Sequence, residues 1–466
     1  AASAVTASGV SGSTGTPIEA PTPLQFAGGE VFDPVLGRTY NELAGEARSM
    51  HKCQGMSQLL PLPASTGGGG GPMGPGGVRN YRLRDTVLEG GVARTDREVF
   101  DGVDTSLRSL LSYAPGAPAD LGAGLDRIGA AVADARRAFA TGGEGATVPP
   151  LTRGLKALRE VRAWLASSTL PEAARYEIDF RLAQKDPQFA KALMLATDLR
   201  IDAVSRDGLV VAGQPLAVDL MAANRGESPV EVAVVAHGFG APVACEAAPL
   251  APGSSRNCSK TVTVPADARL TAAHFHTGTA GARYVFDADV PFGLPFRPTP
   301  YTATFTMTVD STPFTITLPI QARSDLDLFA GEKRQEVHVV PAFSVATTPD
   351  TVIVPLKTAT PVTKDVRVTV TNHAKGAAKA EVALEVPAGW RSTPPTQPVS
   401  FTREDESVTV RFAVQPPAAS LLAAAAMKPG GNQFKVNAVV RAGAVSFVPA
   451  RPRSAIADSS SWMPRT

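Results

Sequence analysis

The chain has 466 residues, which is enough for about three domains of ordinary size. Apolar residues make up 44% and charged residues 19% of the sequence, and this balance excludes a wholly disordered chain. The net charge is only +2, so the sequence offers no basic surface of the kind that binds nucleic acid. Many short runs rich in valine and threonine, together with 42 glycines and 40 prolines, favour β-structure over most of the length.

The sequence has no segment that predicts membrane insertion. A transmembrane helix needs about 18 apolar residues, and the longest candidate, LLAAAAM at 421–427, is too short. The first residues, AASAVTASGV, lack the basic region and apolar core of a signal peptide, and they lack an initiator methionine. We therefore expect either that processing removed a leader or that the chain is a piece of a longer protein.

The N-terminal part is predicted to hold one helix and a flexible linker. Residues 1–35 are small, polar and proline-rich, and they predict loop or extended chain. A helix is expected over 38–52, where apolar residues recur every three or four positions. Five consecutive glycines at 67–71 predict an exposed, protease-sensitive linker. A phosphate-binding loop is the alternative, but no G-K-[ST] sequence follows.

The region 118–200 is predicted to be helical. One apolar stripe of alternating four- and three-residue steps runs from Leu121 to Phe139, and a second runs from Leu151 to Leu165. A third helix is expected near Pro171. A fourth is expected to start at Asp186-Pro187, with Asp186 as its N-cap. Four helices with short breaks predict a small helical bundle.

Beyond residue 200 the apolar period changes from that of a helix to that of a strand. YTATFTMTV at 301–309 alternates apolar residues with threonines, which predicts a half-buried antiparallel strand. A pattern of strand, asparagine-and-glycine turn, and strand occurs at 215–236 and again at 365–390. Regularly spaced short strands of this kind favour β-sandwiches of immunoglobulin type.

The predicted fold class is therefore multidomain and mainly β, with a small helical bundle followed by two immunoglobulin-like β-sandwich domains. The expected parts are a one-helix region at 1–58, a Gly/Pro-rich linker at 59–80, a helical region at 81–200, a β-sandwich at 201–345, an immunoglobulin-like β-sandwich at 346–450, and a disordered tail at 451–466.

Two of the three cysteines could form a disulfide. Cys245 and Cys258 are 13 positions apart in a β-rich stretch, with the turn-like sequence APGSSRN between them. A bridge between them would suit an exported protein. Two reduced structural cysteines remain the alternative reading of the same sequence.

The sequence contains few candidates for catalysis. Of the six histidines only His274 and His276 are closely spaced, and no third ligand lies near them in the sequence. Neither a G-x-S-x-G nor an H-E-x-x-H motif occurs. Trp390 alone gives little basis for a sugar-binding platform, and we expect it to pack at the edge of a sandwich. These observations argue against a self-contained enzyme.

The stretch FDPVLGRTYNELAGEARSMHKCQGM at 32–56 resembles the closing part of the catalytic domain in the PIG-L (LmbE-like) deacetylases. In that family a late helix ends in His-x-[Ser/Thr]-Gln, and the corresponding residues here are His51, Lys52, Cys53 and Gln54, with a cysteine in place of the hydroxyl residue. GEKRQEVHVVPAFSV and PFGLPFRPTP resemble the long C-terminal region of large bacterial members. The stretch from VRVTVTN to LEVPAGW is similar to a β-sandwich module found beside glycosidase domains.

The resemblance implies zinc-dependent hydrolysis of an N-acetyl group, usually on an amino sugar, with zinc expected for the complete family enzyme. The family's metal ligands and base lie in an A-H-P-D-D-E segment and an H-x-x-H motif, and neither occurs here. No catalytic, metal or cofactor-binding residue can therefore be carried over. His51 and Gln54 are expected only as pocket-edge or helix-packing residues, and this chain alone is expected to be inactive and to hold no cofactor.

Two functions follow as hypotheses. The first is an accessory C-terminal region of an exported, periplasmic or extracellular N-deacetylase, with a glycan or amino sugar as the expected partner. The alternative is a stand-alone glycan-binding or scaffolding β-sandwich protein with no catalytic activity.

Overall fold

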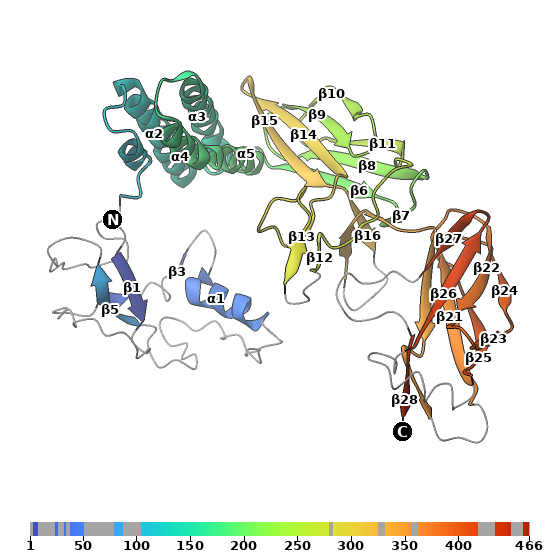
Figure 1. Cartoon of the computed structure of the whole chain (residues 1–466). Helices are drawn as coiled ribbons and strands as arrows, with labels where there is room; N and C mark the ends of the chain where they lie inside the picture. The colour runs from blue at the N-terminus through green and yellow to red at the C-terminus, as the bar shows by residue number, and fades with distance from the viewer. Residues whose placement is uncertain are drawn as a thin grey trace. The chain divides into compact units, whose positions relative to one another are not determined.

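The computed structural model describes residues 3–7, 24–26, 32–33, 38–50, 79–86, 104–278, 283–324, 331–355, 362–417, 434–448 and 460–465. The chain divides into two units, Ala1–Pro115 and Gly116–Thr466. As Figure 1 shows, the protein is mainly β, with several sheets and a few helices. Among the described residues, no helix is both long enough and apolar enough to span a membrane.

The first unit contains several short strands and one helix. Strands β1 (Ser3–Ala7), β5 (Arg79–Thr86) and β2 (Leu24–Phe26) form an antiparallel sheet in that order. Short strands β3 (Phe32–Asp33) and β4 (Arg38–Thr39) pair just before helix α1 (Tyr40–Ser49). Strands β1, β2 and β3 agree with the extended chain that was one of the two predictions for 1–35, whereas β5 differs from the helical region predicted from residue 81. In the sequence of β5, tyrosine and leucine alternate with charged residues. This alternation is too short to predict a strand from the sequence alone.

Helix α1 begins with a capping box. The Thr39 hydroxyl accepts a hydrogen bond from the Glu42 backbone N–H at 3.2 Å, and the Glu42 carboxylate accepts one from the Thr39 N–H at 2.6 Å. The two bonds satisfy backbone groups that have no partner within the helix. The helix ends at Ser49. His51 and Gln54 lie outside the described residues.

The second unit starts with four helices that pack on one another. They are α2 (Ala119–Gly142), α3 (Val148–Ser167), α4 (Glu172–Ala183) and α5 (Lys185–Ala196). The predicted stripes of α2 and α3 are buried around Leu125 and Leu158. A methyl group on Gly154 would lie 2.7 Å from the Phe189 ring, so this glycine allows the close approach of α3 and α5.

The predicted N-cap at Asp186 is wrong. Helix α5 begins one residue earlier, at Lys185, and the residue before it, Gln184, already has helical backbone angles. The chain therefore passes from α4 to α5 with little interruption, and Asp186 lies within the first turn. Its carboxylate instead accepts a hydrogen bond from Arg159 Nε at 3.1 Å. Arg159 also donates to the backbone oxygen of Pro313 at 2.6 Å, which links the helices to the first β region.

The first β region contains two main sheets. One has the order β10-β9-β14-β15 and the other β11-β8-β6-β16-β17. The strands are β6 (Leu199–Ser205), β8 (Pro215–Asn224), β9 (Val230–His237), β10 (Val243–Leu250), β11 (Ser255–Thr263), β14 (Thr302–Val309), β15 (Thr312–Pro319), β16 (Gln321–Ser324) and β17 (Lys333–Glu336). In β14 the apolar residues are buried and alternate with half-buried threonines, which confirms the predicted half-buried strand.

Two short pairs accompany these sheets. Strand β7 (Leu209–Val210) pairs with β18 (His338–Val339), and β12 (Phe275–Thr277) pairs with β13 (Tyr284–Phe286).

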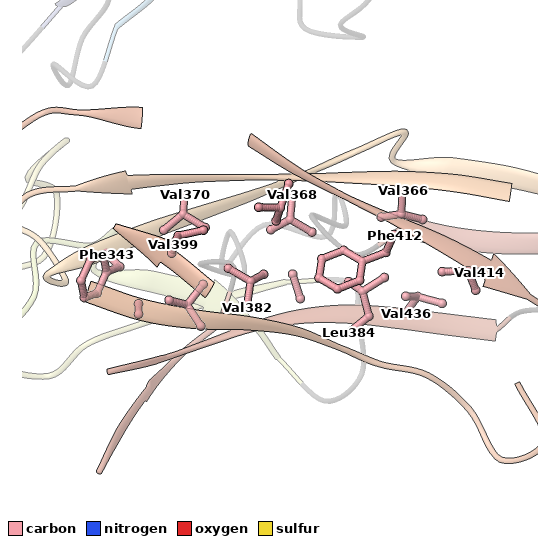
Figure 2. Packing of buried hydrophobic residues seen from close by; sticks show 14 of the residues in the cluster. Phe343, Val366, Val368, Val370, Val382, Leu384, Val399, Phe412, Val414 and Val436 are labelled. Carbon is pink, nitrogen blue, oxygen red and sulfur yellow. The ribbon is translucent and has the colours of Figure 1, made fainter. Parts of the chain in front are cut away.

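The second β region also has two sheets, which share one hydrophobic core (Figure 2). Their orders are β19-β21-β25-β23 and β20-β28-β26-β22-β24, with β27 beside β26. The strands are β19 (Phe343–Thr348), β20 (Thr351–Pro355), β21 (Lys364–Asn372), β22 (Ala378–Glu385), β23 (Arg391–Thr393), β24 (Thr396–Phe401), β25 (Ser407–Gln415), β26 (Phe434–Ala442), β27 (Val445–Phe447) and β28 (Ser460–Arg465). Val368 from one sheet and Val382 from the other are fully buried in this core.

Two expectations for this region have definite outcomes. Trp390 is buried and its ring lies 5.3 Å from that of Phe434, so packing is its role, as predicted. The disordered tail predicted at 451–466 differs from the structure at 460–465, where β28 pairs with β20 and β26. An edge strand offers unpaired backbone groups to any segment, so this pairing needs no apolar pattern in the added strand.

One buried asparagine closes the turn after β8, and another closes the turn after β21. The Asn224 amide nitrogen donates to the backbone oxygens of Ser228 and Leu250, at 2.8 and 2.9 Å. The Asn372 amide nitrogen donates to the oxygens of Ala374, Gly376 and Arg403, at 3.0 to 3.2 Å. Both side chains are almost fully buried. The two β regions therefore use the same device to satisfy backbone carbonyls in a buried turn.

We expect Asn372→Ala to lower the free energy of unfolding by about 3 kcal/mol, because it leaves several buried carbonyls without a donor. Denaturant titration followed by tryptophan fluorescence measures the change. Asn257→Ala is the matched control; its side chain is exposed, and a change within about 0.5 kcal/mol is expected. Equal destabilisation by the two substitutions would contradict the role given to the buried amide.

Candidate functional site at the junction of the two β regions

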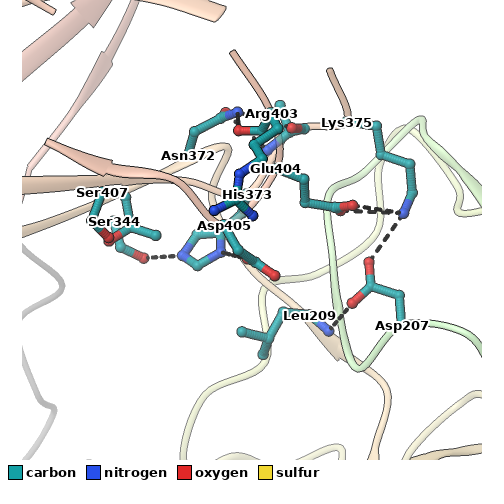
Figure 3. A network of polar contacts seen from close by, with 12 residues as sticks. Asp207, Leu209, Ser344, Asn372, His373, Lys375, Arg403, Glu404, Asp405 and Ser407 are labelled. Atoms are coloured by element: carbon teal, nitrogen blue, oxygen red, sulfur yellow. Dashed lines mark hydrogen bonds and ion pairs between the residues drawn. The ribbon is translucent and has the colours of Figure 1, made fainter. Parts of the chain in front are cut away.

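A network of polar contacts between the two β regions centres on Lys375, in the turn after β21 (Figure 3). Lys375 Nζ lies 3.2 Å from Asp207 Oδ2 in the first region and 3.2 Å from Glu404 Oε1 in the second. The Lys375 backbone N–H donates to Gln214 Oε1, also in the first region, at 3.1 Å. One lysine therefore contacts both regions through its side chain and its backbone.

The charges of this cluster depend on one another. Burial by itself would lower the pKa of Lys375, but hydrogen bonds with Glu404 and Asp207 outweigh it and hold that pKa above its ordinary value. Burial is the main reason that the pKa of Glu404 lies above its ordinary value. The ammonium opposes this rise in Glu404 and the Asp207 carboxylate adds to it. Lys375 therefore neutralises two carboxylates that would otherwise repel each other.

A serine, a histidine and an aspartate meet beside the same turn. Ser344 Oγ lies 2.7 Å from His373 Nε2, and His373 Nδ1 lies 3.4 Å from Asp405 Oδ1. His373 is buried, and its backbone N–H donates to the Ala342 oxygen at 2.8 Å. The distance to Asp405 is short enough for an ion pair, yet His373 Nδ1 makes no hydrogen bond. Orienting an imidazole requires a directional bond, and the contact between His373 Nδ1 and Asp405 does not provide one.

This arrangement has the order of contacts of a hydrolase triad but not its geometry. A serine nucleophile needs a base that a third group orients, and donors for the oxyanion. The Asp405 carboxylate is two-thirds exposed and does not orient the ring through a hydrogen bond. Ser344 lies within β19, in register with Thr371 of β21. We interpret the Ser344–His373 contact as structural: it ties the first strand of the second β region to the turn after β21.

The residues predicted as site candidates have different outcomes. His51 and Gln54 fall outside the described residues, so the structure places neither of them. Cys245 and Cys258 form a disulfide between β10 and β11, which belong to different sheets, with their Cα atoms 6.4 Å apart.

The described residues offer no site for the zinc that the family resemblance implies. No group of three or more histidine, cysteine or acidic side chains capable of holding a metal occurs in the described part of the chain. His274 is buried beside the rings of Phe275 and Phe286, whereas the His276 side chain is nearly half exposed.

Sequence reasoning missed Lys375. Asp207 lies 168 positions from it, and no local pattern reports such a contact. The repeated turn with asparagine and glycine was the available signal, because it indicated that the residues after Asn372 form an ordered turn.

No protein-family model and no curated protein matches the sequence. Among solved structures, the chain is similar to red sea bream transglutaminase, with 10% identity over 61% of this chain and 34% of that one, at a TM-score of 0.24. It is similar to the E. coli alpha-2-macroglobulin, with 14% identity over 57% of this chain and 17% of that one, at a TM-score of 0.19. A Porphyromonas gingivalis W83 protein of unknown function gives 10% identity over 57% and 99% of the two chains, at a TM-score of 0.17. The chain thus spans about a third of the transglutaminase, and similarities this low carry no inference about function.

We expect the Cys245–Cys258 bridge to stabilise the first β region by about 3 kcal/mol, because it closes a short loop in the unfolded chain. The measurement is the melting temperature with and without reductant, together with a count of free thiols. Cys53→Ser serves as the control and should leave the effect of reductant unchanged. A melting temperature insensitive to reductant, with both thiols free in the untreated protein, would contradict the bridge.

Proposed function

We propose that this chain is the accessory, non-catalytic region of an exported zinc-dependent N-deacetylase of the PIG-L type. In this proposal a small helical bundle and two immunoglobulin-like β-sandwiches form a spacer that positions the enzyme relative to its glycan or amino-sugar substrate. The resemblance of residues 32–56 to the closing part of the catalytic domain supports the link to the enzyme. The disulfide between Cys245 and Cys258 supports export, because such bridges persist in oxidising compartments.

The assignment of the two β regions as immunoglobulin-like sandwiches rests on their shared construction. In the second region two antiparallel-rich sheets enclose one core of valine, phenylalanine and one tryptophan. In both regions a buried asparagine closes the turn between two strands of opposite sheets, β8 to β9 and β21 to β22. Crossing between sheets at such turns is a feature of β-sandwiches.

The observation that carries the spacer function is the Lys375 junction. Two domains joined only by a linker are expected to move relative to each other. Here Lys375 is held by Asp207, Gln214 and Glu404, and β18, just before the second region, pairs with β7 of the first. These contacts favour a fixed angle between the two sandwiches, which is what a spacer needs.

The second candidate function is a stand-alone glycan-binding or scaffolding protein. The observation that favours it is a group of exposed aromatic side chains on β13 and in the loop that follows, including Tyr284, Phe286 and Phe292. Several exposed aromatic side chains that lie close together usually mark a contact surface.

We expect the purified chain to retain no zinc and to release no acetate from N-acetylglucosamine derivatives, because the family's ligand motifs do not occur in its sequence. Metal analysis and an acetate-release assay measure the two properties. Stoichiometric zinc, with turnover abolished by His51→Ala, would show that the chain is itself a deacetylase and would overturn the proposal. Lys52→Ala, next to it, is the control for a non-specific effect.

We expect Lys375→Met to increase the radius of gyration of the full chain in small-angle X-ray scattering. The substitution leaves the partly buried carboxylates of Asp207 and Glu404 without their shared cation, so they repel each other across the junction. Lys379→Met, on an exposed position of β22, is the matched control and should leave the scattering unchanged. Identical scattering for Lys375→Met and the wild type would contradict the spacer function without bearing on the zinc assay.

A further inference from the structure

The most exposed apolar side chains of the described β regions lie in one short loop. Residues 290–296, with the sequence VPFGLPF, contain no polar side chain. Phe292 is 93% exposed, Phe296 is 80% exposed and Leu294 is 38% exposed, whereas Val290 at the start of the loop is buried. The loop therefore presents large apolar groups to solvent from a buried anchor.

The tip of the loop has a defined backbone conformation. The Leu294 N–H donates to the Pro291 oxygen at 3.5 Å, and Gly293 has a φ of +91°. A hydrogen bond from the fourth residue back to the first, with a left-handed glycine at the third position, is typical of a type II turn. Phe292 occupies the second position and lies at the apex. The turn chemistry, not burial of the phenylalanine, orders this tip.

Ion pairs close the base of the loop. Arg297 donates to Asp289 and to Asp287, both at 2.6 Å, and Arg269 donates to the same two carboxylates at 3.1 and 2.8 Å. Because Asp289 precedes the loop and Arg297 follows it, their contact joins its two ends. The Asp287 side chain is largely buried, which holds the paired arginines against the body of the β region.

The exposed aromatic surface continues from the loop onto the β12–β13 hairpin. The Phe292 ring lies 6.1 Å from that of Phe286, and the Phe275 ring lies 5.2 Å from that of Tyr284. The planes of these two ring pairs meet at 76° and 73°. Sugar-binding platforms present rings in a common plane, so a glycan fits this surface poorly.

The surroundings of the loop favour a lipid surface over a protein partner. A stable protein interface covers about 800 Å² on each partner and requires complementary shape. Apolar side chains that project from a turn into water suit a bilayer boundary, which accepts apolar groups without a shaped pocket. Arg269 and Arg297 lie at the base of the loop and Arg283 directly precedes Tyr284, so positively charged side chains that can contact anionic headgroups accompany the aromatic surface.

We propose that residues 290–296 and the adjoining aromatic side chains of Tyr284 and Phe286 dock the protein on an anionic lipid surface, with Phe292 and Phe296 entering the headgroup boundary. Lipid contact at this tip is compatible with the accessory function, and it replaces a glycan by a lipid as the partner of the exposed aromatic side chains that favour the second candidate function.

The test is co-sedimentation of the full chain with vesicles of phosphatidylcholine and phosphatidylglycerol. We expect Phe292→Ser with Phe296→Ser to reduce binding by about tenfold or more, because both rings leave water on docking. Tyr176→Ser with Phe180→Ser is the matched control, since these stacked rings on α4 are 62% and 51% exposed. The control should bind as the wild type does. Unchanged melting temperatures would show that both double variants are folded.

A second measurement locates the tip. Phe292→Trp should give a blue-shifted tryptophan emission on addition of the same vesicles, whereas Phe180→Trp should not. Equal vesicle binding by the loop double variant and the wild type would overturn the proposal. So would Phe292-dependent binding of soluble N-acetylglucosamine oligomers, or Phe292-dependent self-association in light scattering, if vesicles are not bound.

Discussion

The amide of a buried asparagine at the end of a strand is the contact on which the arrangement of both β regions depends. In each region its nitrogen donates to carbonyls of its own turn and of a segment distant in the sequence, and its backbone oxygen accepts from a residue in the left-handed conformation. That residue is Gly253 with φ of +72° in the first region and Asp405 with φ of +57° in the second. The asparagine thus fixes two turns of the region at once. In the second region those turns carry His373, Lys375 and Glu404, so the junction is built on the same contact.

Local patterns predicted the parts of the fold that local chemistry determines. The alternation of apolar residues and threonines in β14 predicts which side chains face the core. In the structure every second side chain of this strand is buried, as that alternation requires. The apolar stripes of α2 and α3 follow the same logic with the helical period. Trp390 could be placed correctly because one large ring after a strand has nowhere else to bury its surface. These features depend on residues within about ten positions of one another, which a single sequence displays directly.

The features that sequence reasoning missed depend on contacts between distant segments. Asp186 has the residue type and spacing of an N-cap, but α4 leads into α5 without an extended residue, and Arg159 takes the carboxylate instead. Strand β28 forms because β20 and β26 offer it backbone partners, whatever its own pattern. The Lys375 cluster joins positions 207, 214, 375 and 404. No periodicity in one segment contains the information that these side chains meet.

The candidate contact surfaces of this protein differ from its cores in how they are ordered. In the second β region, side chains such as Val368 and Phe412 are fixed because burial removes their surface from water. The 290–296 loop holds Phe292 in place while leaving it in water, and it does so with a left-handed glycine, two prolines and the Arg297–Asp289 pair. Because the loop is ordered without burying Phe292, the apolar surface of this side chain is available for contact with a partner. A surface that is both pre-ordered and apolar loses little conformational entropy on docking, which is the physical reason for placing the lipid contact at this tip and not in a looser segment.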